Sequence, residues 1–120
     1  MHSLVLADLE PTEVWSLFEA ISRVPRCSGK EQRIRAWVRE WAAARGIPCR
    51  EDAVGNLLLR READPGWGDV PTLVLQAHLD MVCVRRPGAA VDPEQDPLEL
   101  RLEGSVVRAE GTTLGADNGV

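Results

Sequence analysis

The chain has 120 residues, of which 44% are hydrophobic and 28% are charged, and its formal net charge is -5. This size and composition suit one globular domain with a hydrophobic core. The acidic balance and the lack of interleaved basic and aromatic residues exclude a typical nucleic-acid-binding protein, and no apolar run is long enough to cross a membrane.

The first ten residues do not resemble a targeting segment. Their three-residue apolar run is followed by acidic residues, whereas a secretory signal has a basic start and a longer apolar stretch. The cysteines, Cys27, Cys49 and Cys83, are odd in number, widely spaced and in no CxxC pair. This pattern predicts reduced thiols in a cytoplasmic protein, and it makes the cysteines poor zinc ligands.

Two amphipathic helices are expected before the first strand. Pro11 precedes apolar residues at positions 14, 17, 18 and 21, which form one face of a helix, and proline suits a helix start. Ser28 and Glu31 have the spacing of a capping box, which predicts that a second helix begins there and that Gly46 ends it. The apolar stripe of this second helix consists of Ile34, Trp37, Val38, Trp41 and Ala42.

Short strands are expected in the remainder of the chain. "IPCRE" and "NLLLRR" flank the turn-rich "DAVGN" and predict a hairpin, and "LELRLEG" followed by "SVVRA" predicts another. Between them, "TLVLQA" (residues 72–77) is a continuous apolar run, as in a strand that is covered on both faces. Two helices followed by strands predict a single α/β domain with a mixed sheet.

A histidine and an aspartate follow this apolar run in the stretch "LQAHLDMV" (residues 75–82). In α/β sheets, binding groups gather beyond the carboxyl ends of strands. His78 and Asp80 face the same way if the backbone stays extended there. A carboxylate commonly fixes the tautomer of a metal-bound histidine. Taken alone, "HLD" favours a structural histidine over a metal ligand, because a histidine near a strand end is more often a structural residue.

A second polar stretch, "GTTLGADNGV", occupies residues 111–120. It has too few apolar residues for a core strand, and it lacks the repeated acidic positions of a calcium loop. Asp117 precedes Asn118 and Gly119, which together are also a common turn signal. A plain turn and a metal-binding loop both remain open for this segment.

Together, "LQAHLDMV" and "GTTLGADNG" resemble the aminoacyl-histidine dipeptidases, also called cytosolic non-specific dipeptidases, within the zinc-dependent exopeptidases. Residues 14–47 and "EDAVGNLLLRR" are similar to the N-terminal region of the same family, so the likeness covers nearly the whole chain. The segment "VRRPGAAVDPEQDPLEL" (residues 84–100) departs from the family in its proline and alanine content, which affects the expected loop structure more than the chemistry.

The resemblance implies hydrolysis of small dipeptides with two divalent metal ions, zinc first and manganese or cobalt as alternatives. It implies that His78 ligates one ion, that Asp117 bridges both, and that Asp80 is the active-site acid that orients His78. The resemblance is compatible with a homodimer of the complete protein. The charge and the apolar runs predict no nucleic-acid or membrane partner, and the cysteine pattern predicts a cytoplasmic location.

The expected site is incomplete. Two ions with about three protein ligands each need more donors than His78 and Asp117 provide, His2 has no neighbouring motif, and the family's general base is a glutamate further downstream. Residues 1–120 are therefore expected to be the N-terminal portion of a zinc-exopeptidase-like catalytic domain, inactive alone. A related metal-dependent aminoacylase or carboxypeptidase, and a non-catalytic binding domain with the same fold, are the alternatives.

Overall fold

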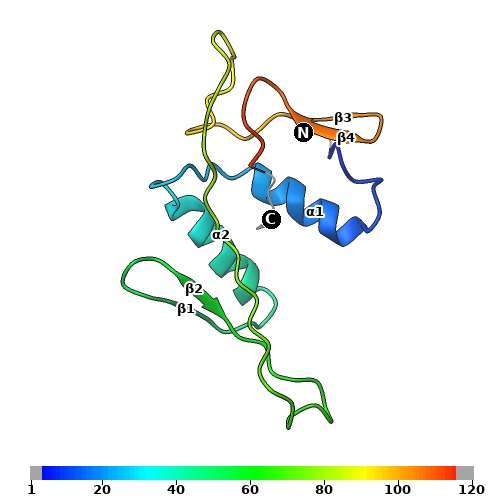
Figure 1. Ribbon diagram of the computed structural model, residues 1–120, viewed down its shortest axis with the longest axis vertical. Coiled ribbons are helices and arrows are strands. Elements are labelled where there is room, and N and C mark those ends of the chain that lie inside the picture. The colour runs from blue at the N-terminus through cyan, green and yellow to red at the C-terminus, as the bar shows by residue number, and fades with distance from the viewer. Residues whose placement is uncertain (1–3, 116–120) are drawn as a thin grey trace.

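The computed structural model describes residues 4–115, which contain two helices and two β-hairpins (Figure 1). The elements follow in the order α1 (Thr12–Ser22), α2 (Gln32–Ala43), β1 (Cys49–Glu51), β2 (Leu57–Leu59), β3 (Leu100–Glu103) and β4 (Val106–Ala109). This succession agrees with the expected α/β class. Both predicted hairpins are present, and they form two separate antiparallel pairs instead of one mixed sheet. None of the helices among these residues is long and apolar enough to cross a membrane.

The two helices begin differently from one another. Helix α1 starts directly after Pro11, as predicted. Helix α2 starts after Glu31, which makes no side-chain capping bond, so the predicted capping box is wrong. Ser28 lies in the loop before the helix, and its hydroxyl donates to Asp80 instead. The reason is tertiary: the loop at Ser28 lies beside residues 80–81, so a distant partner replaces the local one.

Helix α2 ends as the sequence predicts. Gly46 has a φ of +65°, a left-handed conformation that glycine adopts without a steric penalty. The amide of Gly46 donates to the carbonyl of Ala43, and the amide of Ile47 donates to the carbonyl of Ala42. These two bonds satisfy the last carbonyls of the helix. Along the predicted stripe, Ile34 and Ala42 are buried and the others are half-buried.

The predicted covered strand at residues 72–77 is wrong. This segment is extended but belongs to no strand, and the side chains of Leu73, Val74 and Leu75 are 81%, 76% and 86% exposed. It lies on the long trace that joins the lower and upper loops in Figure 1. No backbone hydrogen bond within residues 4–115 joins it to another segment. The apolar side chains of this segment are therefore not buried by any other segment within residues 4–115.

The core contains residues from both ends of the chain. Leu6, Met81, Leu98 and Leu100 form a buried cluster, against which Trp15 and Phe18 of α1 pack. The buried carboxylate of Glu19 accepts hydrogen bonds from the amides of Val5 and Leu6. Because Met81 is part of the buried cluster, it fixes the segment that follows residues 72–77 to the rest of the fold.

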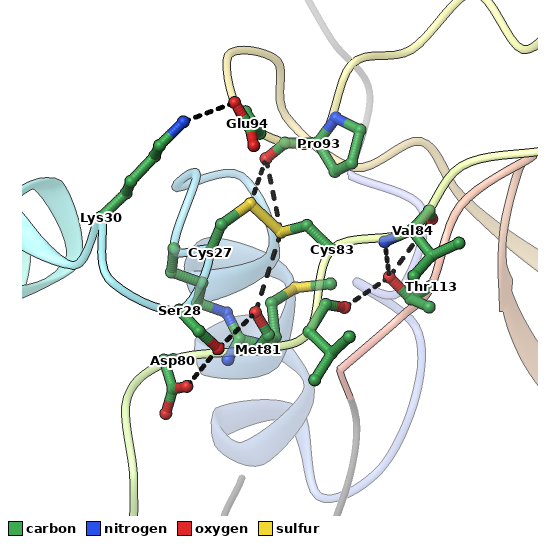
Figure 2. Close-up of a disulfide and its surroundings, with 12 residues drawn as sticks. Cys27, Ser28, Lys30, Asp80, Met81, Cys83, Val84, Pro93, Glu94 and Thr113 are labelled. Atoms are coloured by element: carbon green, nitrogen blue, oxygen red, sulfur yellow. Dashed lines mark hydrogen bonds and ion pairs between the residues drawn. A yellow bond between two sulfur atoms is a disulfide. The ribbon is translucent and has the colours of Figure 1, made fainter.

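A disulfide joins Cys27 to Cys83, with 5.4 Å between their Cα atoms (Figure 2). The prediction of reduced thiols is therefore wrong for these two residues, whereas Cys49 carries a free thiol. The sequence gives no local sign of the pairing because 56 positions separate the two cysteines. A parallel bridge between Cys27 and Met81 brings the two segments together.

Candidate functional site

The candidate site lies where three distant segments meet. Residues 80–85 lie between the loop that joins α1 to α2 and the segment that follows β4. On one side, the amide of Met81 donates to the carbonyl of Arg26 (2.9 Å), and the amide of Ser28 donates to the carbonyl of Met81 (3.0 Å). On the other side, the hydroxyl of Thr113 donates to the carbonyl of Val82 (2.7 Å). These bonds place the "HLD" motif beside the start of the second polar motif.

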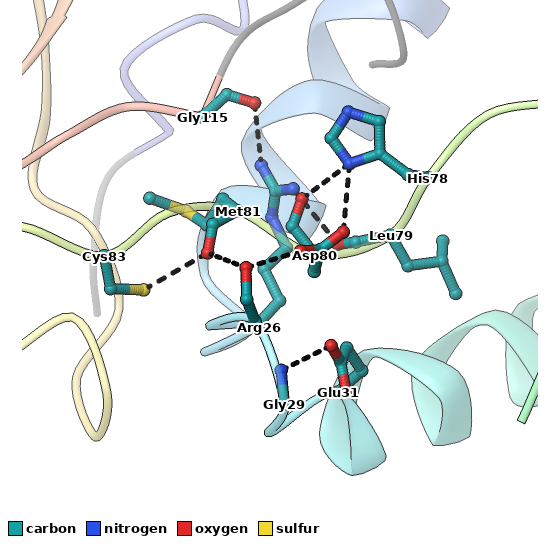
Figure 3. Close-up of polar contacts among 10 residues, drawn as sticks. Arg26, Gly29, Glu31, His78, Leu79, Asp80, Met81, Cys83 and Gly115 are labelled. Atoms are coloured by element: carbon teal, nitrogen blue, oxygen red, sulfur yellow. Dashed lines mark hydrogen bonds and ion pairs between the residues drawn. The ribbon is translucent and has the colours of Figure 1, made fainter. Parts of the chain in front are cut away.

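His78 and Asp80 contact each other directly. The Nδ1 atom of His78 lies 3.1 Å from Oδ1 of Asp80 and 2.9 Å from the backbone oxygen of Asp80 (Figure 3). Both side chains are partly open to solvent, with 47% and 36% of their surfaces exposed. The contact expected from their two-residue spacing is therefore present, and the pair is accessible to a ligand.

Ser28 fixes the carboxylate of this pair. Its hydroxyl donates to Oδ2 of Asp80 at 2.5 Å (Figure 2). The Ser28 hydroxyl, followed by the His78 ring, lowers the pKa of Asp80 because both interactions favour the charged carboxylate. An ionised carboxylate only accepts hydrogen bonds, so Nδ1 of His78 carries the proton. A metal ion bound by this ring would then be bound through Nε2.

Asp117, the other predicted ligand, lies outside the described residues, and so do His2, Asn118 and Gly119. The structure does describe Gly115, whose carbonyl accepts a hydrogen bond from the Arg26 guanidinium at 3.4 Å. Within residues 4–115, no three histidine, cysteine or acidic side chains are grouped so that they could hold a metal ion. The described donors, an imidazole with a carboxylate partner, fit one ligand of a metal site and not a complete one.

Two residues of this site were not identified from the sequence. The sequence predicts a helix cap at Ser28 and no role for Arg26. Each contacts "HLD" across more than 50 positions of sequence. Sequence spacing cannot predict contacts between residues that are so far apart. The parallel bridge between Cys27 and Met81 brings these residues together in the structure.

The chain, in which a histidine pairs with a carboxylate beyond an extended apolar segment, is similar to known hydrolases. Over 115 residues, 96% of its length, the chain is 38% identical to the cytosol non-specific dipeptidase of Escherichia coli K12. The crystal structure of the aminoacylhistidine dipeptidase from Vibrio alginolyticus matches 98% of the chain with a TM-score of 0.89 and 37% identity. The chain is thus homologous to one segment of these dipeptidases, and it spans 24% of the length of each.

A shorter similarity reaches a different hydrolase. Over 64 residues, 53% of the chain, it is 38% identical to 16% of the LysW-lysine hydrolase of Deinococcus radiodurans. No family model matches the chain. The similarities confirm the resemblance to dipeptidases, the α/β class and the hydrolase relationship that the sequence predicts.

Proposed function

We propose that the chain is the N-terminal segment of a metal-dependent dipeptidase, in which His78 and Asp117 are metal ligands and Asp80 orients His78. The observation that most strongly supports this proposal is the 3.1 Å contact between His78 and Asp80, in a chain with the fold of a dipeptidase segment. An ionised carboxylate against Nδ1 is the usual partner of a histidine that binds metal through Nε2.

Each residue has a distinct part in this proposal. Two divalent ions, when bound, supply the positive charge that polarises a substrate carbonyl and acidifies water. Asp80 retains the proton on Nδ1 of His78, which keeps the lone pair of Nε2 available for coordination. Ser28 holds Asp80 in the orientation that this requires. An imidazole together with carboxylates is a donor set suited to zinc, with manganese or cobalt as alternatives.

The proposal also covers the setting of the complete protein. Dipeptide substrates and a cytoplasmic location are supported by the name of the Escherichia coli relative, a cytosol non-specific dipeptidase. A homodimer is the proposed assembly, and light scattering on the complete protein tests it. Cytosolic reductants keep most thiols reduced. A cytoplasmic location therefore predicts that alkylation of intact cells labels Cys27 and Cys83 in part of the population.

The test of this function uses the complete protein with zinc and a panel of dipeptides. Wild-type protein should hydrolyse dipeptides, whereas His78→Ala should lose both bound zinc and activity. His2→Ala, which removes the other histidine of the chain, is the matched control and should retain both. Wild-type protein that neither binds zinc nor cleaves any dipeptide would refute the proposal and favour the non-catalytic alternative.

A second candidate is a related amide hydrolase, because the LysW-lysine hydrolase shares 38% identity with part of the chain. N-acyl amino acids and longer peptides added to the same panel distinguish it: their preferred cleavage would identify an aminoacylase or a carboxypeptidase. On this proposal the 120-residue chain alone is inactive, because no group of side chains that could hold a metal ion lies within residues 4–115. Dipeptide hydrolysis by this chain, abolished by His78→Ala, would show that the chain is sufficient.

A further inference from the structure

The guanidinium of Arg26 lies between the two polar motifs. Its side chain leaves the loop between α1 and α2 and is buried, with 3% of the residue exposed. Nη1 donates to the carbonyl of Leu79 at 3.2 Å, and Nη2 donates to the carbonyl of Gly115 at 3.4 Å (Figure 3). Leu79 is the residue between His78 and Asp80, and Gly115 lies two positions before Asp117. One side chain therefore contacts both segments that carry the proposed metal ligands.

The chemistry of arginine suits this position. Burial of a charged group costs several kcal/mol in lost hydration, so the hydrogen bonds of the buried guanidinium must offset this cost. Its N–H groups form a planar fork with fixed directions, which can hold two carbonyls at a set separation. A lysine at this position would keep the charge, but it would place a single compact ammonium where the two donors now diverge.

Gly115 is fitted closely against the same arrangement. Its φ is +68°, and a Cβ atom there would lie 2.7 Å from Cβ of Met81 and 3.2 Å from Nη2 of Arg26. Met81 belongs to the buried core and cannot move freely. Any side chain at position 115 must therefore push the second motif away from Arg26 and from the "HLD" segment. The separation of the two motifs is constrained from both sides.

We propose that Arg26 is a positioning residue that sets the distance between the "HLD" segment and the second motif at Gly115, and that metal binding by the complete protein depends on this distance. The proposal rests on the proposed function for the roles of His78 and Asp117. The bonds of Arg26 to Leu79 and Gly115 are independent of those roles. Arg26 does not contact the ions or the substrate in this account; it acts through the two backbone carbonyls.

The experiment measures metal binding in the complete protein, with Zn²⁺ and Co²⁺ as probes. Arg26→Lys is expected to weaken Zn²⁺ binding by about 10–100-fold, as loss of groups that orient metal ligands typically does. It should also change the visible absorption spectrum of bound Co²⁺, which reports coordination geometry. Gly115→Ala displaces the second motif from the opposite side and should act in the same direction. In the double variant, the loss of Zn²⁺ binding free energy should be clearly smaller than the sum of the losses in the two single variants.

Arg33→Lys is the matched control. Arg33 also donates to a carbonyl of a distant segment, that of Gln95, but it is exposed, and within residues 4–115 it makes no hydrogen bond to either motif. It should leave the Zn²⁺ affinity and the Co²⁺ spectrum unchanged. A purely structural role of Arg26 would lower the unfolding temperature of the metal-free protein while the folded fraction bound metal normally.

Several outcomes would overturn the positioning role. One is wild-type affinity and an unchanged Co²⁺ spectrum in folded Arg26→Lys. Another is loss of the native circular dichroism spectrum in both Arg26→Lys and Gly115→Ala, which would assign Arg26 to folding in general. Failure of the proposed function looks different, because wild-type protein itself would then bind no Zn²⁺.

Discussion

The extended segment after β2 has two halves that differ in how they are held. In the exposed half, residues 71–77, the apolar side chains face solvent, and no backbone hydrogen bond within residues 4–115 joins them to another segment. In the anchored half, residues 78–84, Met81 is buried in the core and Cys83 is disulfide-bonded to Cys27. The proposed metal ligand His78 and its partner Asp80 belong to the anchored half.

The difference shows what an apolar run can and cannot predict. The continuous apolar run at residues 72–77 predicts that these side chains are buried, but it does not indicate which segment buries them. The anchored half finds its partners within the chain, in the loop at Arg26 and in the segment at Thr113. The chain spans a quarter of the dipeptidases that it matches, so cover for the exposed half is expected from the rest of such a protein.

The largest expected effect concerns the disulfide of the anchored half. Replacement of Cys27 and Cys83 by serine should lower the free energy of unfolding by about 4 kcal/mol, because the bond closes a long loop in the unfolded chain. Urea unfolding followed by circular dichroism measures this change. Cys49→Ser, which removes the free thiol, should change it by less than about 0.5 kcal/mol. Equal effects of the two replacements would contradict the anchoring role.

Truncation of one side chain in each half compares the halves directly. Met81→Ala should cost about 3 kcal/mol, since it leaves a cavity in the core. In the 120-residue chain by itself, Leu75→Ala removes a side chain that is 86% exposed and should cost less than about 0.5 kcal/mol. The same unfolding experiment measures both values. A cost at Leu75 as large as that at Met81 would mean that the exposed half is packed in solution.

The exposed half should also govern self-association of the chain. An unpaired, extended apolar segment promotes pairing with other chains, so Leu75→Lys should weaken concentration-dependent association several-fold in sedimentation velocity. Val82→Lys is the control from the anchored half, because Val82 is 70% exposed and therefore similarly accessible. If Val82→Lys reduces association as strongly as Leu75→Lys, the exposed half is not the associating surface.

The smallest expected effect concerns Asp80. The Ser28 hydroxyl is the main cause of its lowered pKa, so Ser28→Ala should raise the pKa of Asp80 toward the ordinary aspartate value in an NMR titration. The lowered pKa stabilises the fold above the pKa of an unfolded aspartate, and this stabilisation is lost as the pH falls through the folded value. Ser28→Ala should therefore reduce the acid sensitivity of unfolding. An unchanged Asp80 pKa would argue against the Ser28 contact.

Local signals account for most of what the sequence predicts correctly. Helix α1 after Pro11, the glycine at the end of α2 and both hairpins depend on residues that are neighbours in sequence. The contact between His78 and Asp80 belongs to this group because two positions separate them. The metal roles of His78 and Asp117 remain predictions.

The errors share one physical cause, which is pairing over long sequence distances. Local patterns predict a helix cap at Ser28 and reduced thiols at Cys27 and Cys83. The contacts of all three residues depend instead on a bridge between segments more than 50 residues apart. The strand predicted at residues 72–77 is absent for the converse reason, because no segment within residues 4–115 pairs with it. Local periodicity does not contain either kind of information.

The most direct test of the proposed site is a crystal structure of the complete protein with zinc, with the metal located by anomalous scattering. The account predicts a zinc ion about 2.0–2.1 Å from Nε2 of His78, an Asp117 carboxylate oxygen bound to the same ion, and Asp80 against Nδ1. Zinc bound elsewhere, with His78 and Asp117 pointing apart and Asp80 turned away from the ring, would contradict it.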